Sequence, residues 1–134
     1  MKDSAYQTFI VKTNAVDFGR CDGGTCYLFA APSATMHGAV QDSMKEGKHD
    51  PAVIGKALDL PAKNFEGTLR LMTLDLDTAG VCVRLPVDAD PGVWKCSSPE
   101  DKDCFKFGGY TSGGVPEVMV INAPVAQTRV EEIP

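Results

Sequence analysis

Apolar and polar residues alternate over several short segments of the chain, which is the pattern of strands that bury one face. Residues 6–12, 68–78 and 81–87 follow this period of two. In the second of these segments the apolar phase changes across Met72 and Thr73, which indicates a β-bulge. The pattern therefore predicts strands along much of the chain.

Two further strands are expected near the end of the sequence. Residues 117–122 are nearly all apolar, which is typical of a strand buried on both faces. Residues 123–134 contain Pro124 and Pro134, which limit the pairing of this segment. We therefore expect a central strand followed by an edge strand.

The stretch "RCDGGTC" predicts a tight hairpin. Asp and Gly residues at 22–25 favour a turn, and strand-forming residues flank it on both sides. In this register Cys21 faces Cys26, and Phe18 faces Phe29. The face that carries the two phenylalanines is expected to be buried.

The period changes from two to that of a helix between residues 33 and 58. Ser33 or Thr35 is expected to cap a first helix that ends at Gly47. Asp50 is expected to cap a second, short helix with Pro51 at its first position. Together these segments form a two-helix insertion in a chain of strands.

These elements predict a mostly β fold. We expect a β-sandwich or flattened antiparallel barrel of about seven or eight strands that carries the two-helix insertion. The alternative is an α+β arrangement in which the helices cover one sheet face. Residues 1–134 are expected to form a single globular domain, because this length buries a core and no linker or repeat interrupts it.

The net charge of the chain limits the classes of partner that we expect it to bind. The 134-residue chain has a formal net charge of −5 at pH 7, which argues against nucleic acid and against anionic membrane surfaces. No apolar run approaches the roughly 20 residues of a membrane span. The expected partner is another protein that meets an acidic surface, and homo-oligomerisation is left open.

The sequence gives two opposing indications of compartment. No secretory signal peptide is visible at the start, which favours the cytoplasm. Four of the five cysteines lie in close pairs, which suits an oxidising, extracytoplasmic compartment. The localisation therefore stays open.

The paired cysteines predict two disulfides, Cys21–Cys26 and Cys96–Cys104, each closing a hairpin. Free buried thiols, or a zinc ion held by all four thiolates, are the alternatives. The spacings C-x4-C and C-x7-C differ from a tight zinc knuckle. Cys82 alternates with valines on a predicted strand and is expected to be a half-buried structural residue.

A thiol- or metal-dependent enzyme is the alternative functional class. A catalytic thiol needs a base, and the chain has two histidines, His37 and His49, both in the helical insertion soon after Cys26. Cys21 or Cys26 beside either histidine would form the catalytic pair. Roles at the surface or in helix capping also explain both histidines. Our preferred interpretation therefore assigns no catalytic residue.

Four carboxylates lie close in sequence and could bind Ca²⁺, namely Asp75, Asp77, Asp88 and Asp90. Asp75 and Asp77 are expected to project from one strand face, and the other two lie in a turn. A solvated strand face and an ordinary turn account for them, because the pattern lacks the ligand run of a calcium loop. We therefore expect no metal and no cofactor.

Two polar loops late in the sequence are the expected binding surface. One is rich in Gly and carries Tyr, Thr and Ser, and the other is acidic and lies between two cysteines. The expected binding residues are Tyr110, Thr111, Ser112, Glu100, Asp101 and Asp103. The sequence thus favours a non-catalytic recognition module, such as an inhibitor, an immunity-type factor or an assembly subunit.

Overall fold

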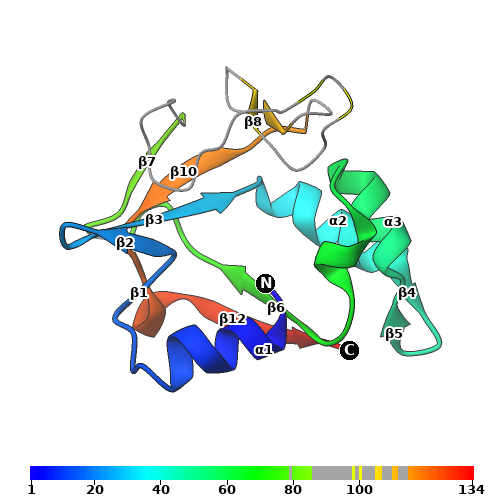
Figure 1. Cartoon of the computed structure of the whole chain (residues 1–134), viewed down its shortest axis with the longest axis horizontal. Helices are drawn as coiled ribbons and strands as arrows, with labels where there is room; N and C mark the ends of the chain where they lie inside the picture. Colours follow the sequence, from blue (N-terminus) through cyan, green and yellow to red (C-terminus); the bar gives the residue numbers. More distant parts are fainter. Residues whose placement is uncertain (79, 86–97, 99, 101–104, 107–109, 112–114) are drawn as a thin grey trace.

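The computed structural model describes residues 1–78, 80–85, 98, 100, 105–106, 110–111 and 115–134. Helices and strands occur in similar amounts along this part of the chain (Figure 1). Their order is α1 (Asp3–Tyr6), the π-helix η1 (Gln7–Val11), β1 (Asp17–Phe18), β2 (Arg20–Asp22), β3 (Thr25–Ala30), α2 (Ser33–Ser43), β4 (Met44–Lys45), β5 (Lys48–His49), α3 (Pro51–Leu58), the 3-10 helix η2 (Ala62–Phe65), β6 (Leu69–Thr73), β7 (Cys82–Arg84), β8 (Phe105–Lys106), β9 (Tyr110–Thr111), β10 (Val118–Ile121), β11 (Ala123–Pro124), the 3-10 helix η3 (Val125–Gln127) and β12 (Arg129–Ile133).

The strands form several small antiparallel sheets. The largest has the order β2-β3-β10-β7, and the remaining pairs are β12–β6, β1–β11, β4–β5 and β8–β9. Within the described ranges the sheets do not close into a barrel. The fold is therefore mixed α+β, and this alternative fits better than the mostly β sandwich or flattened barrel.

The segment expected to be the first strand is helical. Residues 6–11 fall in α1 and η1 instead of a strand, and Lys12 is the C-cap of η1. Tyr6 and Ile10 lie four positions apart and pack into the same cluster, which is the spacing of one helix face. The Thr8 and Thr13 hydroxyls donate to the carbonyl oxygens four residues earlier, at 2.8 and 2.7 Å. Tertiary burial thus overrides the strand propensity of this segment.

The predicted hairpin is confirmed at its turn and wrong beyond it. Cys21 pairs with Cys26 across β2 and β3. Phe18 does not face Phe29, because Phe18 pairs with Ala123 in the separate β1–β11 ladder. Gly19 separates the two ladders with a φ of +106°, and a β-carbon there would collide with the backbone carbonyl of Tyr27.

The two-helix insertion is confirmed, with different ends. Helix α2 begins at Ser33, so this residue is not its N-cap, and it ends before the short β4–β5 hairpin instead of at Gly47. Gly47 has a φ of +80° in the turn of that hairpin. Asp50 caps α3 as expected, since its Oδ1 accepts the Ala52 N–H at 2.9 Å.

The expected bulge is absent from the described chain around residues 72–73. Strand β6 simply ends at Thr73, and bends and turns follow. The expected central strand is confirmed as β10, which pairs with β3 on one side and β7 on the other. Met119 in β10 is fully buried. The expected last strand is β12, which pairs with β6.

The core consists of two clusters of buried residues. The first joins the N-terminal helix to the large sheet, and its buried members are Ile10, Phe18, Val120 and Ala123. The second lies between α2, α3 and β6, and its buried members are Ala39, Ile54, Leu58 and Leu69. The space between these clusters is where the candidate site lies.

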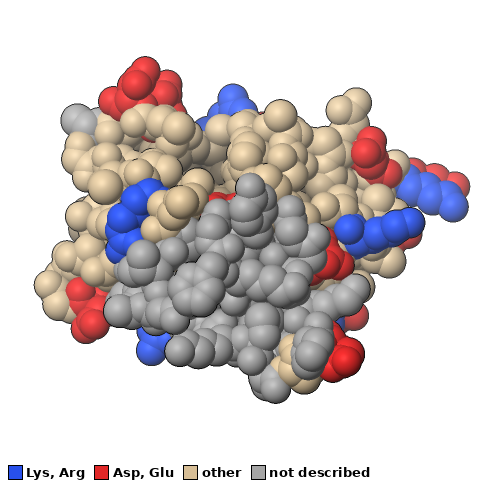
Figure 2. All heavy atoms as spheres, turned by 90° about the horizontal axis from the view of Figure 1, so that it is seen from above, with Lys and Arg blue, Asp and Glu red and all other residues tan. Residues whose placement is uncertain are grey.

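Charged side chains are interspersed on the surface. On the face shown in Figure 2, Asp and Glu side chains lie in separate small groups with Lys and Arg among them. On this face the described residues do not form a continuous acidic patch of the kind the charge balance suggested. None of the described helices has both the length and the apolar character needed to cross a membrane.

Candidate functional site

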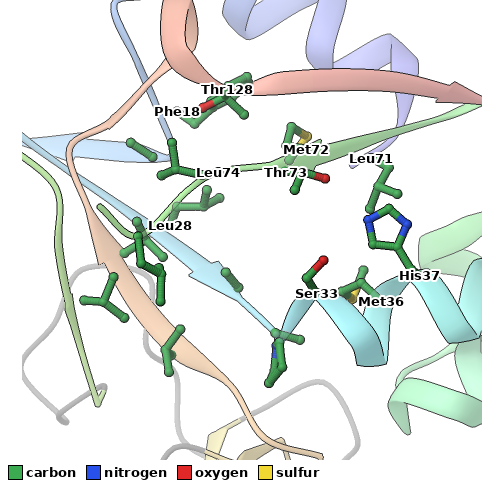
Figure 3. A pocket seen from close by; sticks show the side chains of 18 residues that line it. Phe18, Leu28, Ser33, Met36, His37, Leu71, Met72, Thr73, Leu74 and Thr128 are labelled. Carbon is green, nitrogen blue, oxygen red and sulfur yellow. The ribbon is translucent and has the colours of Figure 1, made fainter. Parts of the chain in front are cut away.

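An apolar cavity of about 330 Å³ lies between the large sheet, β6 and the start of α2 (Figure 3). Its sheet wall is formed by Leu28 and Ala30 of β3 and by Val118 and Val120 of β10. Met72 of β6 contributes to the opposite wall. We call this cavity the larger lobe, because a second, smaller cavity shares part of its walls.

A few polar side chains border the larger lobe. Ser33 and His37 lie four positions apart on one face of α2, and Figure 3 shows both beside Met36, with the β6 residues across the cavity. Ser33 is exposed, whereas His37 is half-buried. The Thr128 hydroxyl also borders the lobe, but it donates to the Pro124 carbonyl at 2.7 Å. Thr73 of β6 also lines the lobe, so Ser33, His37 and Thr73 are the described polar side chains that can meet a ligand there.

A second cavity of about 200 Å³ adjoins the first and is called the smaller lobe. Its additional walls come from α3, η2 and the segment before β10, and include Leu58, Phe65 and Glu117. The residues that line both lobes are Leu28, Ala30, Ala31, Met36, Leu71 and Met72. Because these residues line both cavities, the two lobes lie next to each other between the core clusters.

Glu117 is the acidic residue of the smaller lobe. Its Oε2 atom is buried and has no hydrogen-bond partner among the described residues. Burial removes the carboxylate from water and raises the pKa of Glu117 to about 7. A carboxyl group in this position is close to half-ionised at neutral pH.

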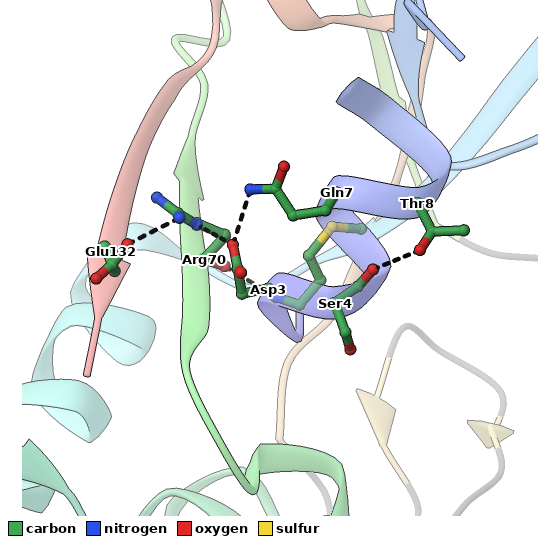
Figure 4. Close-up of polar contacts among 7 residues, drawn as sticks. Asp3, Ser4, Gln7, Thr8, Arg70 and Glu132 are labelled. Carbon is green, nitrogen blue, oxygen red and sulfur yellow. Dashed lines mark hydrogen bonds and ion pairs between the residues drawn. The ribbon is translucent and has the colours of Figure 1, made fainter. Parts of the chain in front are cut away.

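Arg70 of β6 also lines the smaller lobe, but its charge is already engaged (Figure 4). Its Nε lies 2.6 Å from Asp3 Oδ1, and its Nη2 lies 2.8 Å from Glu132 Oε2. The guanidinium also sits over the Tyr6 ring, 5.5 Å from its centroid. The hydrogen bond from Arg70, and then that from Gln7, lowers the pKa of Asp3.

The predicted Cys21–Cys26 disulfide is confirmed. Asn122, the residue after β10, anchors it to the sheet. The Cys26 N–H donates to Asn122 Oδ1 at 3.0 Å, and the Asn122 N–H donates to the Cys26 carbonyl at 2.9 Å. The second predicted pair, Cys96 and Cys104, lies outside the described residues.

The prediction that Cys82 is half-buried is wrong. Cys82 is exposed instead of half-buried, because the face of β7 that carries Val83 turns toward the cavity and Cys82 alternates to the other face. The described residues contain no group of three or more His, Cys, Asp or Glu able to hold a metal ion. Zinc held by all four paired cysteines is not tested, since Cys96 and Cys104 are not described.

The histidines lie apart from the cysteine pair. His37 borders the larger lobe. His49 has its Nδ1 2.7 Å from the Pro134 carbonyl oxygen and its Nε2 2.6 Å from that of Phe65, so its ring ties two segments together. Among described residues, no hydrogen bond joins either histidine to Cys26, whose sulfur is in the disulfide.

The predicted calcium ligands are only partly described. Asp75 and Asp77 do not project from a strand face, because both follow the end of β6. The Asp77 N–H donates to Asp75 Oδ1 at 3.0 Å, so Asp75 forms an Asx-type turn. Asp88 and Asp90 lie outside the described residues.

The predicted binding loops are also described only in part. Tyr110 and Thr111 form β9 and pair with β8, and Glu100 is exposed. Ser112, Asp101 and Asp103 lie outside the described residues.

Apart from His37, which was named as a candidate base, sequence reasoning did not single out the residues that line the two lobes. The available signal was the run Ala30, Ala31, Pro32 between a strand and a helix, where small side chains leave space unfilled. Comparison with protein-family models, curated proteins and solved structures finds no match to this chain. The case for function therefore rests on the geometry alone.

Proposed function

We propose that this chain is a non-catalytic binding module whose ligand is a small, mostly apolar molecule held in the larger lobe. The observation that carries this proposal is the cavity of about 330 Å³ with apolar walls. Ligand sites begin at roughly 300 Å³, and an apolar cavity of about 150 Å³ is enough to bind benzene. An aromatic ring or a short alkyl chain fits such a volume.

The walls of the larger lobe favour an apolar ligand over water. Leu28, Val118 and Val120 offer a water molecule no hydrogen bonds, so a ligand with carbon at this surface gains by displacing it. Protein interiors normally contain few voids larger than a water molecule. Ser33 lines the lobe and is exposed to solvent, so we infer that a ligand enters past it.

Recognition of a protein partner through the cysteine-bracketed loops remains a separate hypothesis from the sequence. The inhibitor, immunity-type and assembly roles all belong to it, as does homo-oligomerisation. Most residues of these later loops lie outside the described part of the chain. The cavity is a separate feature and does not favour any one of these roles.

A fluorescent apolar probe, N-phenyl-1-naphthylamine, tests the proposal. We expect it to bind the wild type with increased emission, and we expect A30F to weaken binding at least about tenfold, because the new ring occupies the larger lobe. A34L is the matched control, since Ala34 is exposed on α2 and lines neither lobe.

Folding of each variant is checked by circular dichroism. If A30F does not fold, A30V makes the same test with a smaller side chain. Equal probe affinity in the wild type and in a folded cavity-filling variant would contradict the proposal, as would equal losses in A30F and A34L.

A further inference from the structure

We propose that Glu117 recognises a cationic amine on the ligand, so that the bound molecule is an apolar amine with its body in the larger lobe and its ammonium group in the smaller one. This inference rests on the proposed function and names the class of ligand that the same site binds. Three observations of the smaller lobe support it.

The first observation is the Glu117 carboxyl group itself. Its Oε2 atom is buried in a wall of the smaller lobe without a hydrogen-bond partner among the described residues. Burying a polar group without a partner costs free energy, and native proteins leave few such groups. A donor supplied by a ligand removes that cost.

The second observation is that the positive groups lining this lobe among the described residues already have other partners. Arg70 is the one Lys or Arg among the described residues that line this lobe, and Asp3 and Glu132 already pair with it. The Met1 amino group, on the same wall, donates to the Arg70 carbonyl oxygen at 2.9 Å. Glu117 is therefore the acceptor in this lobe that an incoming cation would meet.

The third observation is that the two lobes share walls. Leu28, Ala30 and Met36 line both, and the proposed ligand spans the two. An ammonium group donates three hydrogens and carries a positive charge, whereas a carboxylate ligand would meet Glu117 with like charge. An apolar body with an ammonium end thus matches both lobes.

The proton balance of binding follows from the chemistry. Near pH 7 part of the Glu117 population is protonated, because burial raises the pKa of this residue to about 7. When the ammonium binds, that fraction releases its proton to solvent and the ligand keeps its own three protons. Binding of the amine should therefore strengthen as the pH rises from about 5.5 to 8.

Displacement of N-phenyl-1-naphthylamine by three molecules of equal chain length tests the inference. We expect n-octylamine to displace the probe at roughly tenfold lower concentration than 1-octanol, and octanoate to be weakest. In E117Q the advantage of octylamine should disappear while octanol is unchanged. E46Q is the control, because Glu46 is exposed on the β4–β5 hairpin and lines neither lobe.

The outcomes separate the two proposals. If the probe binds in the larger lobe but octylamine and octanol compete equally, the amine inference is overturned and the proposed function stands. If the probe does not bind the wild type, or binds A30F with the same affinity as the wild type, the proposed function is wrong. The amine inference is then wrong as well, because it rests on the proposed function. If E117Q does not fold, the wild type still decides, because a preference for octylamine that is the same at pH 5.5 and pH 8 overturns the role of Glu117.

Discussion

Glu117 couples the stability of the protein to pH in a direction opposite to that of most carboxylates. Its pKa rises from about 4.5 to about 7 through burial, so the folded state holds this proton more tightly than the unfolded chain does. The stabilisation is fully present below about pH 4.5 and is lost as the pH rises through about 7. At the scale of one residue, a buried acid weakens the fold at neutral pH.

Replacement of this acid by a neutral amide should therefore help the fold most at high pH. We expect the free energy of unfolding of E117Q, minus that of the wild type, to grow by up to about 3 kcal/mol between pH 4.5 and pH 8. Urea unfolding at several pH values measures this difference. With E46Q as the surface control, a difference that stays constant with pH would show that Glu117 is well solvated.

Single residues were predictable where their role is local. The cap at Asp50 follows from the residue type and the proline after it, and the structure has the same cap. The exposure of Cys82 depends on which side of β7 faces the cavity, which its neighbours in sequence do not encode. Glu117 lines the smaller lobe together with Leu58 of α3 and Phe65 of η2, which lie far from it along the chain, so its own neighbours in sequence do not indicate this setting.

At the scale of the elements, α3 contains a glycine that packing requires. A β-carbon on Gly55 would lie 2.7 Å from the Leu60 carbonyl oxygen, which belongs to backbone that cannot easily move. In contrast, a β-carbon on Gly38 of α2 would meet nothing within 4 Å. Both glycines sit inside helices, so helix propensity alone predicts the same gain for alanine at each position.

These two glycines form a matched pair of variants. We expect G38A to stabilise the protein by about 0.5–1 kcal/mol, because alanine has the higher helix propensity. We expect G55A to destabilise it by about 1–3 kcal/mol, because the turn from α3 to η2 must shift. Chemical denaturation measures both, and stabilisation by G55A would show that this close approach is absent in solution.

Elements were predictable where one period dominates the segment. The helical spacing of residues 33–58 and the apolar run of β10 both gave the right type of element. The segment at residues 6–12 fits the period of a strand and also that of a helix, because Tyr6 and Ile10 are spaced to lie on one helix face. Packing against Phe18 decides between the two, and the rings of Tyr6 and Phe18 stack 6.4 Å apart.

At the scale of the whole molecule, Arg70 connects three distant parts of the chain. It pairs with Asp3 of α1 and Glu132 of β12 from its place in β6. Arg70 lowers the pKa of Asp3 below 3.8, so the stability from this pair is present above that pH and is lost as the pH falls through the lowered value. The sign is the reverse of that for Glu117.

We therefore expect D3N to lower the melting temperature at pH 7, because the ion pair is lost. The difference from the wild type should shrink in about 1 M NaCl, which screens partly exposed charges. D42N, on the exposed side of α2, is the control. Thermal melts at two salt concentrations check this, and a D3N effect that does not change with salt would show that Asp3 acts through packing instead of charge.

The arrangement of the sheets was the least predictable feature. Strand β3 pairs with β10 across most of the sequence, and β6 pairs with β12 across nearly half of it. Periodicity identifies a strand but carries no information about a partner so far away, which is why a sandwich looked as suitable as the α+β fold. The cavity depends on these long-range pairings, so the candidate site could not be predicted either.

The position of β6 affects how the chain can fold during its synthesis on the ribosome. Leu69 of β6 forms a bridge with Lys2 on one side and pairs with Ile133 of β12 on the other. A nascent chain can dock its first residues on β6 early, but it cannot cover the other edge until β12 has left the ribosome. During that interval the growing chain carries an open strand edge, which is the kind of surface that nascent-chain chaperones protect from aggregation.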